Sequence, residues 1–381
     1  MKMMTMSLVV TSFPTFSTPP ILHQNLKINS SQQSAWLHNN STFPPIQPAG
    51  LVISCFTMIF GTVSNLTGLY ILAKSHARFR RQAKAPFLLL TVALLLADLG
   101  GHVIPGAFAL YLHIIRRYEM QDVKPNKEFC HIFGACMVFF GLCPLLLGCA
   151  MAVERCIAIT KPFFHASMVT VAHMRQVVFF LSSLALVLAI LPFFEVGTYA
   201  IQFPGTWCFL PVHDPQSAAN TILALVFSSL GLAALVLSLM CNILSGLALL
   251  HPRIRSHNDN AKATAAQCPR RASSASSSSV LCSLDVEMMM QLAAITVVSC
   301  VCWSPFLIHI FLMQISQSLK ASAQMEDGFI LLALRMASWN QILDPWVYIL
   351  LRRTVLSRVC CRLSAQRVTV TRNSSSADTN R

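Results

Sequence analysis

Charged residues are scarce in this chain, and acidic residues are scarcer than basic ones. Only 11% of the 381 residues are charged and 55% are hydrophobic, whereas a soluble globular domain has roughly 25% charged residues. This composition argues against a soluble enzyme. The 28 Lys and Arg outnumber the 14 Asp and Glu, but the apolar residues gather in blocks of about 20, long enough to cross a bilayer. The positive charge therefore relates to membrane topology rather than to nucleic acid.

Seven apolar stretches follow the first 50 residues, separated by polar or basic connections. Hydrocarbon offers no water to hydrogen-bond the backbone, so each stretch must be helical, and the continuous apolar pattern excludes a barrel. We predict an all-α membrane protein with a seven-helix transmembrane domain over 51–351. The expected helices span about 51–73, 86–111, 131–156, 176–198, 219–250, 288–315 and 328–351.

The distribution of Lys and Arg predicts the orientation. If the C-terminus is cytoplasmic, 20 of these residues lie on inner segments and seven on outer ones, as the positive-inside rule requires. We therefore expect a multi-pass plasma-membrane protein with an extracellular N-terminal tail over 1–50. The inner loop 252–284, rich in Ser and basic residues, is expected to be flexible. Its Arg270-Arg271-Ala272-Ser273 segment is either a kinase site at Ser273 or a plain solvated linker.

Two segments carry candidate modifications. Asn29, Asn39 and Asn40 begin Asn-x-Ser/Thr triplets in the outer tail and are candidate glycosylation sites. The cytoplasmic segment 352–381 begins with a basic stretch that predicts a short amphipathic helix. Its Cys360 and Cys361 are candidates for palmitoylation beside membrane lipid, or are two unmodified thiols.

Twelve of the 14 cysteines fall inside predicted helices or on the cytoplasmic side, where thiols stay reduced. Only Cys130, at the mouth of the third helix, and Cys208, between the fourth and fifth, lie at outer positions. We therefore predict a disulfide between Cys130 and Cys208 that holds this outer loop over the bundle.

Arg335 is the most informative ionisable residue at membrane depth. A charged side chain there is energetically costly, so its presence indicates a functional site. It lies about 10 Å below the outer end of the seventh helix, with no acid within two turns. An Arg always carries its charge and binds a carboxylate bidentately, so an anionic ligand is its expected partner. A pair with Glu195 or Asp98, or snorkelling to the surface, is the alternative.

Two absences narrow the ligand class. The third helix has no acid between Cys130 and Glu154 that could bind an ammonium ligand, and the seventh has no Lys that could form a Schiff base with retinal. A long acyl chain with one acid and a few hydroxyls suits a pocket lined by apolar, Gly and Met residues with few polar groups. The candidate ligand-binding residues are Arg335, Thr206, His102, Met137 and His113.

Two acids in the bundle predict an ion site. We expect Asp98 and Asp344 to face each other with Asn65 and Asn340 as neighbours, and to bind a sodium ion or share a proton, because two nearby buried acids repel each other. The alternative is a pair of separate, hydrogen-bonded acids.

Several motifs, in order along the chain, resemble the class A, or rhodopsin-like, G-protein-coupled receptors over about 50–365. They are Asn65 in GTVSN, Asp98 in LLADL, Glu154-Arg155-Cys156, Cys302-Trp303-Ser304-Pro305 and Asp344-Pro345-Trp346-Val347-Tyr348. Within that class, FPGTWCF and RMASWNQILDPWVYILLR look like a prostanoid receptor. GHVIPGA and the Ser-rich loop followed by DVEM are most similar to the calcium-mobilising first subtype of prostaglandin E2 receptor.

The resemblance implies roles for these residues. Arg335 would bind the prostaglandin carboxylate with help from Thr206, while His102 and Met137 would lie near the ring. Glu154 and Arg155 would face a Gq-family G protein that signals through phospholipase C and calcium, with receptor kinases and arrestin as later partners. Trp303, Pro305, Asp344 and Tyr348 would take part in activation. His113 stands where many prostanoid receptors have a Tyr.

Alternative functions make different demands on the sequence. A receptor for prostaglandin F2α or thromboxane is the nearest alternative, because the ring substituents differ by about one hydrogen bond. A transporter or channel would call for internal repeats and a polar path. A membrane enzyme would call for a nucleophile with its base, or a metal set, and the scattered acids and histidines show no such spacing. We expect no enzymatic activity, cofactor or metal.

Overall fold

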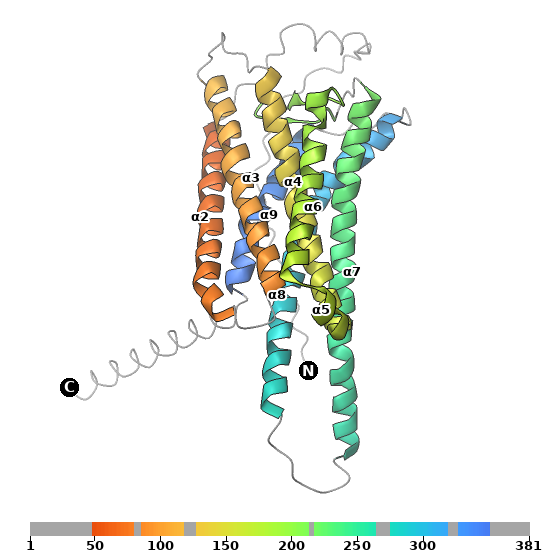
Figure 1. Cartoon of the computed structure of the whole chain (residues 1–381). Coiled ribbons are helices and arrows are strands. Elements are labelled where there is room, and N and C mark those ends of the chain that lie inside the picture. Colours follow the sequence, from red (N-terminus) through yellow and green to blue (C-terminus); the bar gives the residue numbers. More distant parts are fainter. Residues whose placement is uncertain are drawn as a thin grey trace, which may run out of the picture. The chain divides into compact units, whose positions relative to one another are not determined.

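Helices make up almost all of the structure, a computed structural model that describes residues 48–79, 85–117, 127–212, 217–263, 275–318 and 327–350. Within these ranges seven long helices form one bundle (Figure 1). They are α2 (Pro48–Phe79), α3 (Ala85–Arg117), α4 (Lys127–Thr160), α6 (Val171–Ile190), α7 (Ala218–Ala263), α8 (Ala275–Ser318) and α9 (Asp327–Leu350). Each overlaps one of the seven predicted stretches, so the predicted all-α bundle is confirmed.

Six of these helices, all except α9, are long and apolar enough to cross a membrane. The seventh, α9, packs against α2, α3 and α8. It carries Arg335, Asn340, Gln341 and Asp344 within 24 residues, so polar side chains replace apolar ones along part of its length.

The fourth predicted helix is shorter than expected. Thr170 caps the start of α6 by accepting a hydrogen bond from the backbone N–H of His173, and the α-helix ends at Ile190. The chain continues as the 3-10 turn η1 (Leu191–Phe194), with Pro192 near its start, because proline lacks an N–H and clashes with the preceding helical turn. Glu195 then takes a left-handed conformation, φ 63°. The expected end at 198 was therefore wrong.

The inner loop expected over 252–284 is also shorter in the structure. The helix α7 continues to Ala263 and α8 begins at Ala275, leaving 264–274, with Ser273, outside the described residues. Extending an existing helix costs far less than nucleating one, and the Ala and Lys of 261–263 are good helix formers.

A small hairpin between α6 and α7 covers one end of the bundle. Strands β1 (Ala200–Gln202) and β2 (Trp207–Phe209) pair antiparallel, with Ile201 opposite Cys208. The predicted Cys130–Cys208 disulfide is present, with Cα atoms 5.5 Å apart. Trp207 and Phe209 both contact the ring of Phe306 on α8. The hairpin is thus fixed to α4 covalently and to α8 by packing.

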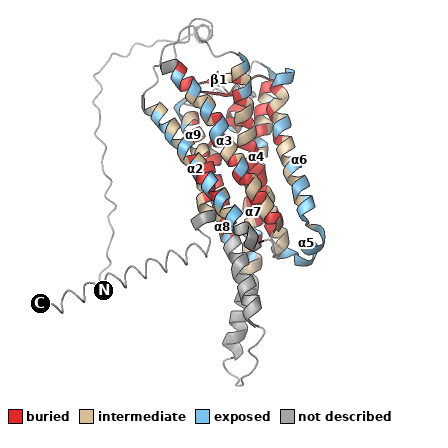
Figure 2. Ribbon diagram, turned by 60° about the vertical axis from the view of Figure 1, so that its left-hand side comes forward, coloured by how far each residue is buried: buried red, intermediate tan, exposed pale blue. Residues whose placement is uncertain are grey.

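The helix α4 lies at the centre of the bundle, packed against α3, α6, α7, α8 and both strands. Figure 2 shows buried residues concentrated along α4 and α7. Gly134 lies directly under the ring of Tyr199, leaving no room for a β-carbon. The Tyr199 hydroxyl donates to the carbonyl of Ala189 at 2.8 Å, and burial raises the pKa of Tyr199. This ring joins α4, α6 and the hairpin.

Candidate functional site

A cavity of about 730 Å³ lies beneath the hairpin. Its walls come from α2, α3, α4, α8 and α9, and the 203–207 turn of the hairpin contributes Thr206 and Trp207. Most of the lining is apolar, aromatic or glycine. The polar and charged lining side chains are Ser54, Thr57, His102, His113, Thr206, Arg335, Ser338 and Gln341.

All five predicted ligand-binding residues line this cavity. Thr206 comes from the hairpin, His102 and His113 from α3, Met137 from α4 and Arg335 from α9. These positions are separated by up to 233 residues in sequence, and the fold brings them to one cavity. Their roles in binding stay predictions.

Arg335 is the only positively charged residue in the lining that the structure describes. It is exposed, and no carboxylate of the described residues pairs with it. Glu195 lies on the chain beyond η1 and Asp98 is buried in α3, so neither forms the ion pair considered as an alternative. The guanidinium is therefore available to an anionic ligand.

The two histidines of the cavity have different surroundings. The His102 ring packs directly on Gly61 of α2, where a β-carbon would collide with it, and its Nε2 has no hydrogen-bond partner in the described part of the chain. Nδ1 of His113 lies 2.8 Å from the carbonyl of Ala109, one turn earlier. His102 thus has an unused ring nitrogen, while His113 is tied to its own helix.

Sequence reasoning missed two parts of this lining. Ser54 and Thr57 on α2 and Gln341 on α9 all border the cavity. The α2 pair carries a weak signal, because polar residues three apart lie on the same face of a helix. Gln341 has no signal in the sequence, since an amide beside Asn340 is equally typical of a buried structural position.

The predicted ion-site residues are all buried at mid-bundle. Asp98 lies close enough to Asp344 to interact with it electrostatically, and the Asn340 amide donates to Oδ2 of Asp344 at 3.2 Å. The Asn65 amide donates to the carbonyls of Gly61 and Gln341, both at 3.0 Å. Asp344 and Arg335 therefore face different neighbours.

Five buried oxygens of this cluster have no hydrogen-bond partner among the described residues. They are Oδ1 of Asn65, Asp98, Asn340 and Asp344, and Oδ2 of Asp98. Buried polar atoms normally have partners, so this set fits a small cation or a proton. Among described residues, no group of three or more His, Cys, Asp and Glu is arranged to hold a metal ion, and a cation here would depend on amide oxygens as well.

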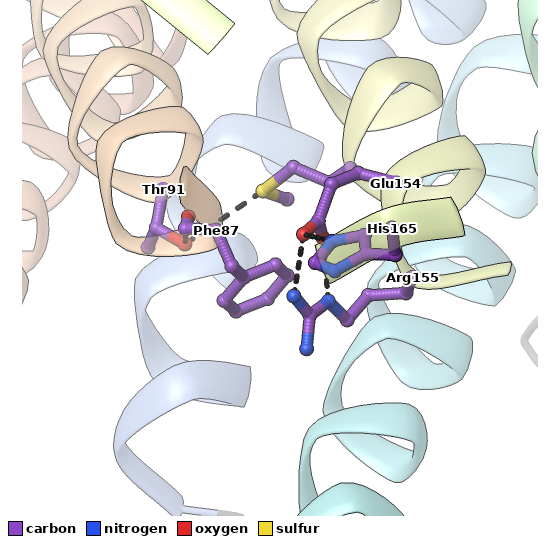
Figure 3. Close-up of polar contacts among 6 residues, drawn as sticks. Phe87, Thr91, Glu154, Arg155 and His165 are labelled. Carbon is purple, nitrogen blue, oxygen red and sulfur yellow. Dashed lines mark hydrogen bonds and ion pairs between the residues drawn. The ribbon is translucent and has the colours of Figure 1, made fainter. Parts of the chain in front are cut away.

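At the other end of the bundle, near the short helix α5 (Pro162–Met168), Arg155 is held by its neighbour (Figure 3). Its Nε and one terminal nitrogen each donate to a Glu154 oxygen at 2.5 Å. Nε2 of His165 on α5 lies 2.8 Å from the same carboxylate, and the guanidinium lies 4.9 Å from the centre of the Phe87 ring. No motif in the sequence predicts the His165 contact.

Trp303 lies at the bottom of the cavity, next to the bundle core. It is buried, lines the cavity and contacts Phe306 edge to face, with ring centroids 6.2 Å apart. Gly141 of α4 leaves room for its ring. Pro305 follows within α8 and cannot donate a backbone hydrogen bond. Trp303 thus connects the cavity to the middle of α8.

Several predicted positions fall outside what the structure describes. They are the glycosylation candidates Asn29, Asn39 and Asn40, the phosphorylation candidate Ser273, the palmitoylation candidates Cys360 and Cys361, the amphipathic helix after 351, and the side chain of Tyr348.

Seven helices, a cavity closed by a disulfide-linked hairpin and a Glu-Arg pair at the opposite end define a heptahelical receptor. Residues 48–348 match the family described as 7 transmembrane receptor (rhodopsin family), and the chain belongs to this family. Its members are receptors rather than enzymes.

Two groups of relatives are prostaglandin receptors. The human prostaglandin E2 receptor EP1 subtype is 44% identical over 352 residues, covering 85% of both chains. The human prostaglandin F2-alpha receptor is 39% identical over 346 residues, covering 88% of this chain and 90% of that receptor. The crystal structure of squid rhodopsin superimposes with a TM-score of 0.65 at 14% identity, covering 84% of this chain and 88% of that one; this likeness concerns the fold alone.

Proposed function

We propose that the chain is a plasma-membrane receptor for a prostaglandin, with prostaglandin E2 as the first candidate, and that it activates a Gq-family G protein. The observation that carries this proposal is the Arg335 guanidinium, without a carboxylate partner among the described residues, on the wall of a largely apolar cavity. A lipid with one carboxylate matches that combination. The prostaglandin E2 receptors among the relatives support the choice of ligand.

The proposed orientation sets the hairpin outside and α5 inside. Thr206 on the hairpin and Arg335 on α9 would then receive a ligand carboxylate near the outer surface, with His102 and Met137 deeper toward the ring. The excess of Lys and Arg in the connections assigned to the inner side supports this orientation.

The α5 end has features that suit G-protein coupling. Glu154 holds Arg155 by two short hydrogen bonds, an arrangement that a second acceptor could replace when α8 moves. Phe163 on α5, two residues before His165, is 91% exposed, so a large apolar side chain is exposed on the helix that contacts Glu154. Receptor kinases and arrestin would act on the same side, with Ser273 as a candidate site.

A second candidate ligand is prostaglandin F2α, because F2-alpha receptors are also relatives, at 39% identity. Calcium release in cells that express the chain separates the candidates. We expect prostaglandin E2 to release calcium at lower concentration than F2α, and a Gq-family inhibitor to block the response. A response to neither lipid, despite surface expression, contradicts the proposed function.

The Asp98 and Asp344 cluster is proposed to bind sodium, or to share a proton, in the resting receptor. We expect sodium to lower agonist affinity in the wild type, because a cation between the two carboxylates stabilises the resting arrangement, and Asp98→Asn to remove most of this dependence. Radioligand binding in sodium and in N-methylglucamine buffers measures it. Affinity that ignores sodium in the wild type, or an unchanged dependence in Asp98→Asn, argues for separate hydrogen-bonded acids.

The His165 contact predicts a change in basal signalling. His165→Ala removes a hydrogen bond to the Glu154 carboxylate and leaves this group less fixed in its hold on Arg155. We expect ligand-independent signalling to rise about tenfold, because a hydrogen bond to a charged group contributes about 1.5–3 kcal/mol, and agonist affinity to rise with it, because agonists bind the active arrangement more tightly. His173→Ala is the matched control, because His173 is exposed and bonds only Thr170 in the described part of the chain. Equal basal signals in both variants would count against a role of His165 in holding the Glu154–Arg155 pair.

A further inference from the structure

A side-chain hydrogen bond joins α7 to α8, away from the cavity. Nδ2 of Asn242 on α7 donates to Oγ1 of Thr296 on α8 at 2.8 Å, and to the backbone carbonyl of Ser238, one turn earlier on α7, at 2.9 Å. Thr296 is only 4% exposed, and Asn242 is half-buried. The bond therefore connects two helices at positions 54 residues apart in sequence.

The bond to Ser238 determines which way the amide of Asn242 faces. A backbone carbonyl can only accept, so one hydrogen of the NH₂ group points toward Ser238 and the other toward Thr296. The amide oxygen Oδ1 is buried and has no hydrogen-bond partner among the described residues. The side chain of Asn242 is thus held through its nitrogen, and Thr296 supplies the hold that comes from another helix.

Both residues lie within the apolar spans of their helices. Asn242 precedes the end of its span at Leu249 by seven residues, and Thr296 follows the start of its span at Met289 by seven, a depth of about 10 Å on each helix. The hydrocarbon there offers no water that could replace the bond, and polar side chains at such depths hold helices together. Losing one such bond should shift an equilibrium between helix arrangements about three- to tenfold.

The bond lies near the Glu154–Arg155 pair at the α5 end of the bundle. The thiol of Cys241, the residue before Asn242, lies against the thiol of Cys156 on α4. Cys156 directly follows Arg155. Two polar contacts, one within α4 and one between α7 and α8, are therefore present together at the end proposed to couple to a G protein.

A change in the bend of α8 would move Thr296. Pro305 interrupts the backbone hydrogen bonds of α8 nine residues after Thr296, a separation of about 13 Å. A change of about 20° in a bend at this proline displaces Thr296 by about 4–5 Å. Unless α7 moves by the same amount, a 2.8 Å hydrogen bond does not survive this displacement.

We propose that the hydrogen bond from Asn242 to Thr296 ties α8 to α7 in the resting receptor and breaks when α8 moves. The proposal rests on the G-protein coupling stated under the proposed function, and adds to the Glu154–Arg155 pair a second restraint on a different pair of helices. The tie stabilises the resting arrangement alone. Removing it therefore raises the fraction of receptor in which α8 has moved, without any ligand.

The test measures ligand-independent recruitment of labelled G proteins, one from each family, to the full chain in cells, at matched surface expression. Thr296→Val keeps the shape of the side chain and removes the hydroxyl, so basal recruitment should rise about three- to tenfold. Asn242→Leu should have a similar effect. Thr296→Ser retains the hydroxyl and should stay near the wild-type level.

The double variant decides whether the two residues act through one bond. Because either single change already removes it, Asn242→Leu combined with Thr296→Val should be no more active than the more active single variant. Ser245→Ala is the matched control, since this buried hydroxyl of α7 bonds the carbonyl of Cys241 on its own helix, and its loss should leave basal recruitment unchanged.

Three results would each overturn the proposal: basal recruitment at the wild-type level in Thr296→Val, an equal rise in Thr296→Ser, or effects that add in the double variant. Calcium release by prostaglandin E2 in the same cells tests the ligand separately. A wild type that does not respond to prostaglandin E2 refutes the proposed ligand, while the comparison of basal recruitment, made without ligand, still decides the role of the tie.

Discussion

Replacing Arg335 by Ala should reduce the affinity for a prostaglandin free acid by about 30-fold or more. The ligand carboxylate loses water when it enters the cavity, and removing its charged partner there costs about 2–5 kcal/mol. Arg335→Lys should recover only part of the affinity, because a point charge cannot reproduce the bidentate guanidinium. Competition binding on membranes measures all three receptors.

An esterified ligand separates recognition from folding. The ester should bind the wild type poorly, and Arg335→Ala should weaken it much less than the free acid. General misfolding would lower both affinities and leave no coupling between protein and ligand. Arg175→Ala, at an exposed arginine of α6 outside the cavity, should leave both ligands unaffected. An equal loss for acid and ester in Arg335→Ala means that Arg335 has a structural role and that the carboxylate lies elsewhere.

Removing the Cys130–Cys208 disulfide should produce the second large effect. The bridge joins residues 78 apart in sequence, and closing a loop of that length in the unfolded chain corresponds to about 4–5 kcal/mol in the entropic account. Cys130→Ser and Cys208→Ser should each remove most surface expression and ligand binding. Flow cytometry of an N-terminal tag, with radioligand binding on the same cells, measures both.

The double variant is the sharper test of the pairing. Because either single change already breaks the bridge, Cys130→Ser combined with Cys208→Ser should be no worse than either alone. Losses that add would indicate two independent roles. Cys55→Ser is the control, since Cys55 is a free thiol on α2 and its replacement should leave expression near the wild-type level.

The helices could be predicted because the bilayer imposes a simple requirement on the backbone. A long apolar stretch has one way to satisfy its hydrogen bonds, so seven stretches gave seven helices. The ends of the helices depend on local residues, such as prolines and helix-forming side chains, that a hydropathy pattern does not distinguish. Pro192 ended α6 early, and the helical continuation of α7 and α8 replaced much of the expected loop.

Some residues of the candidate site could likewise be predicted from the sequence, and others could not. Arg335 and Asp98 could be predicted as functional residues because a charged side chain at membrane depth is energetically costly and indicates a functional role. Gln341 and His165 could not, because their importance comes from partners distant in sequence: Phe140, 201 residues away, and Glu154, which is 11 residues away but on another helix. Neither side chain is unusual for the stretch in which it occurs.

The two helices with the least burial within the protein affect the stability of the receptor during extraction from the membrane. In α2 and α6 only 17% of the most apolar segment is buried within the protein, against 39–50% in α3, α4, α7 and α8. Most of their surface is therefore solvated by lipid. Replacing lipid with detergent should affect the packing of these two helices before that of the others. Because α2 also supplies Ser54, Thr57 and Met58 to the cavity wall, extraction would disturb the ligand site directly. A ligand bound before solubilisation would hold α2 against α9. Because it binds only the folded site, it would offset the destabilisation of that site by detergent.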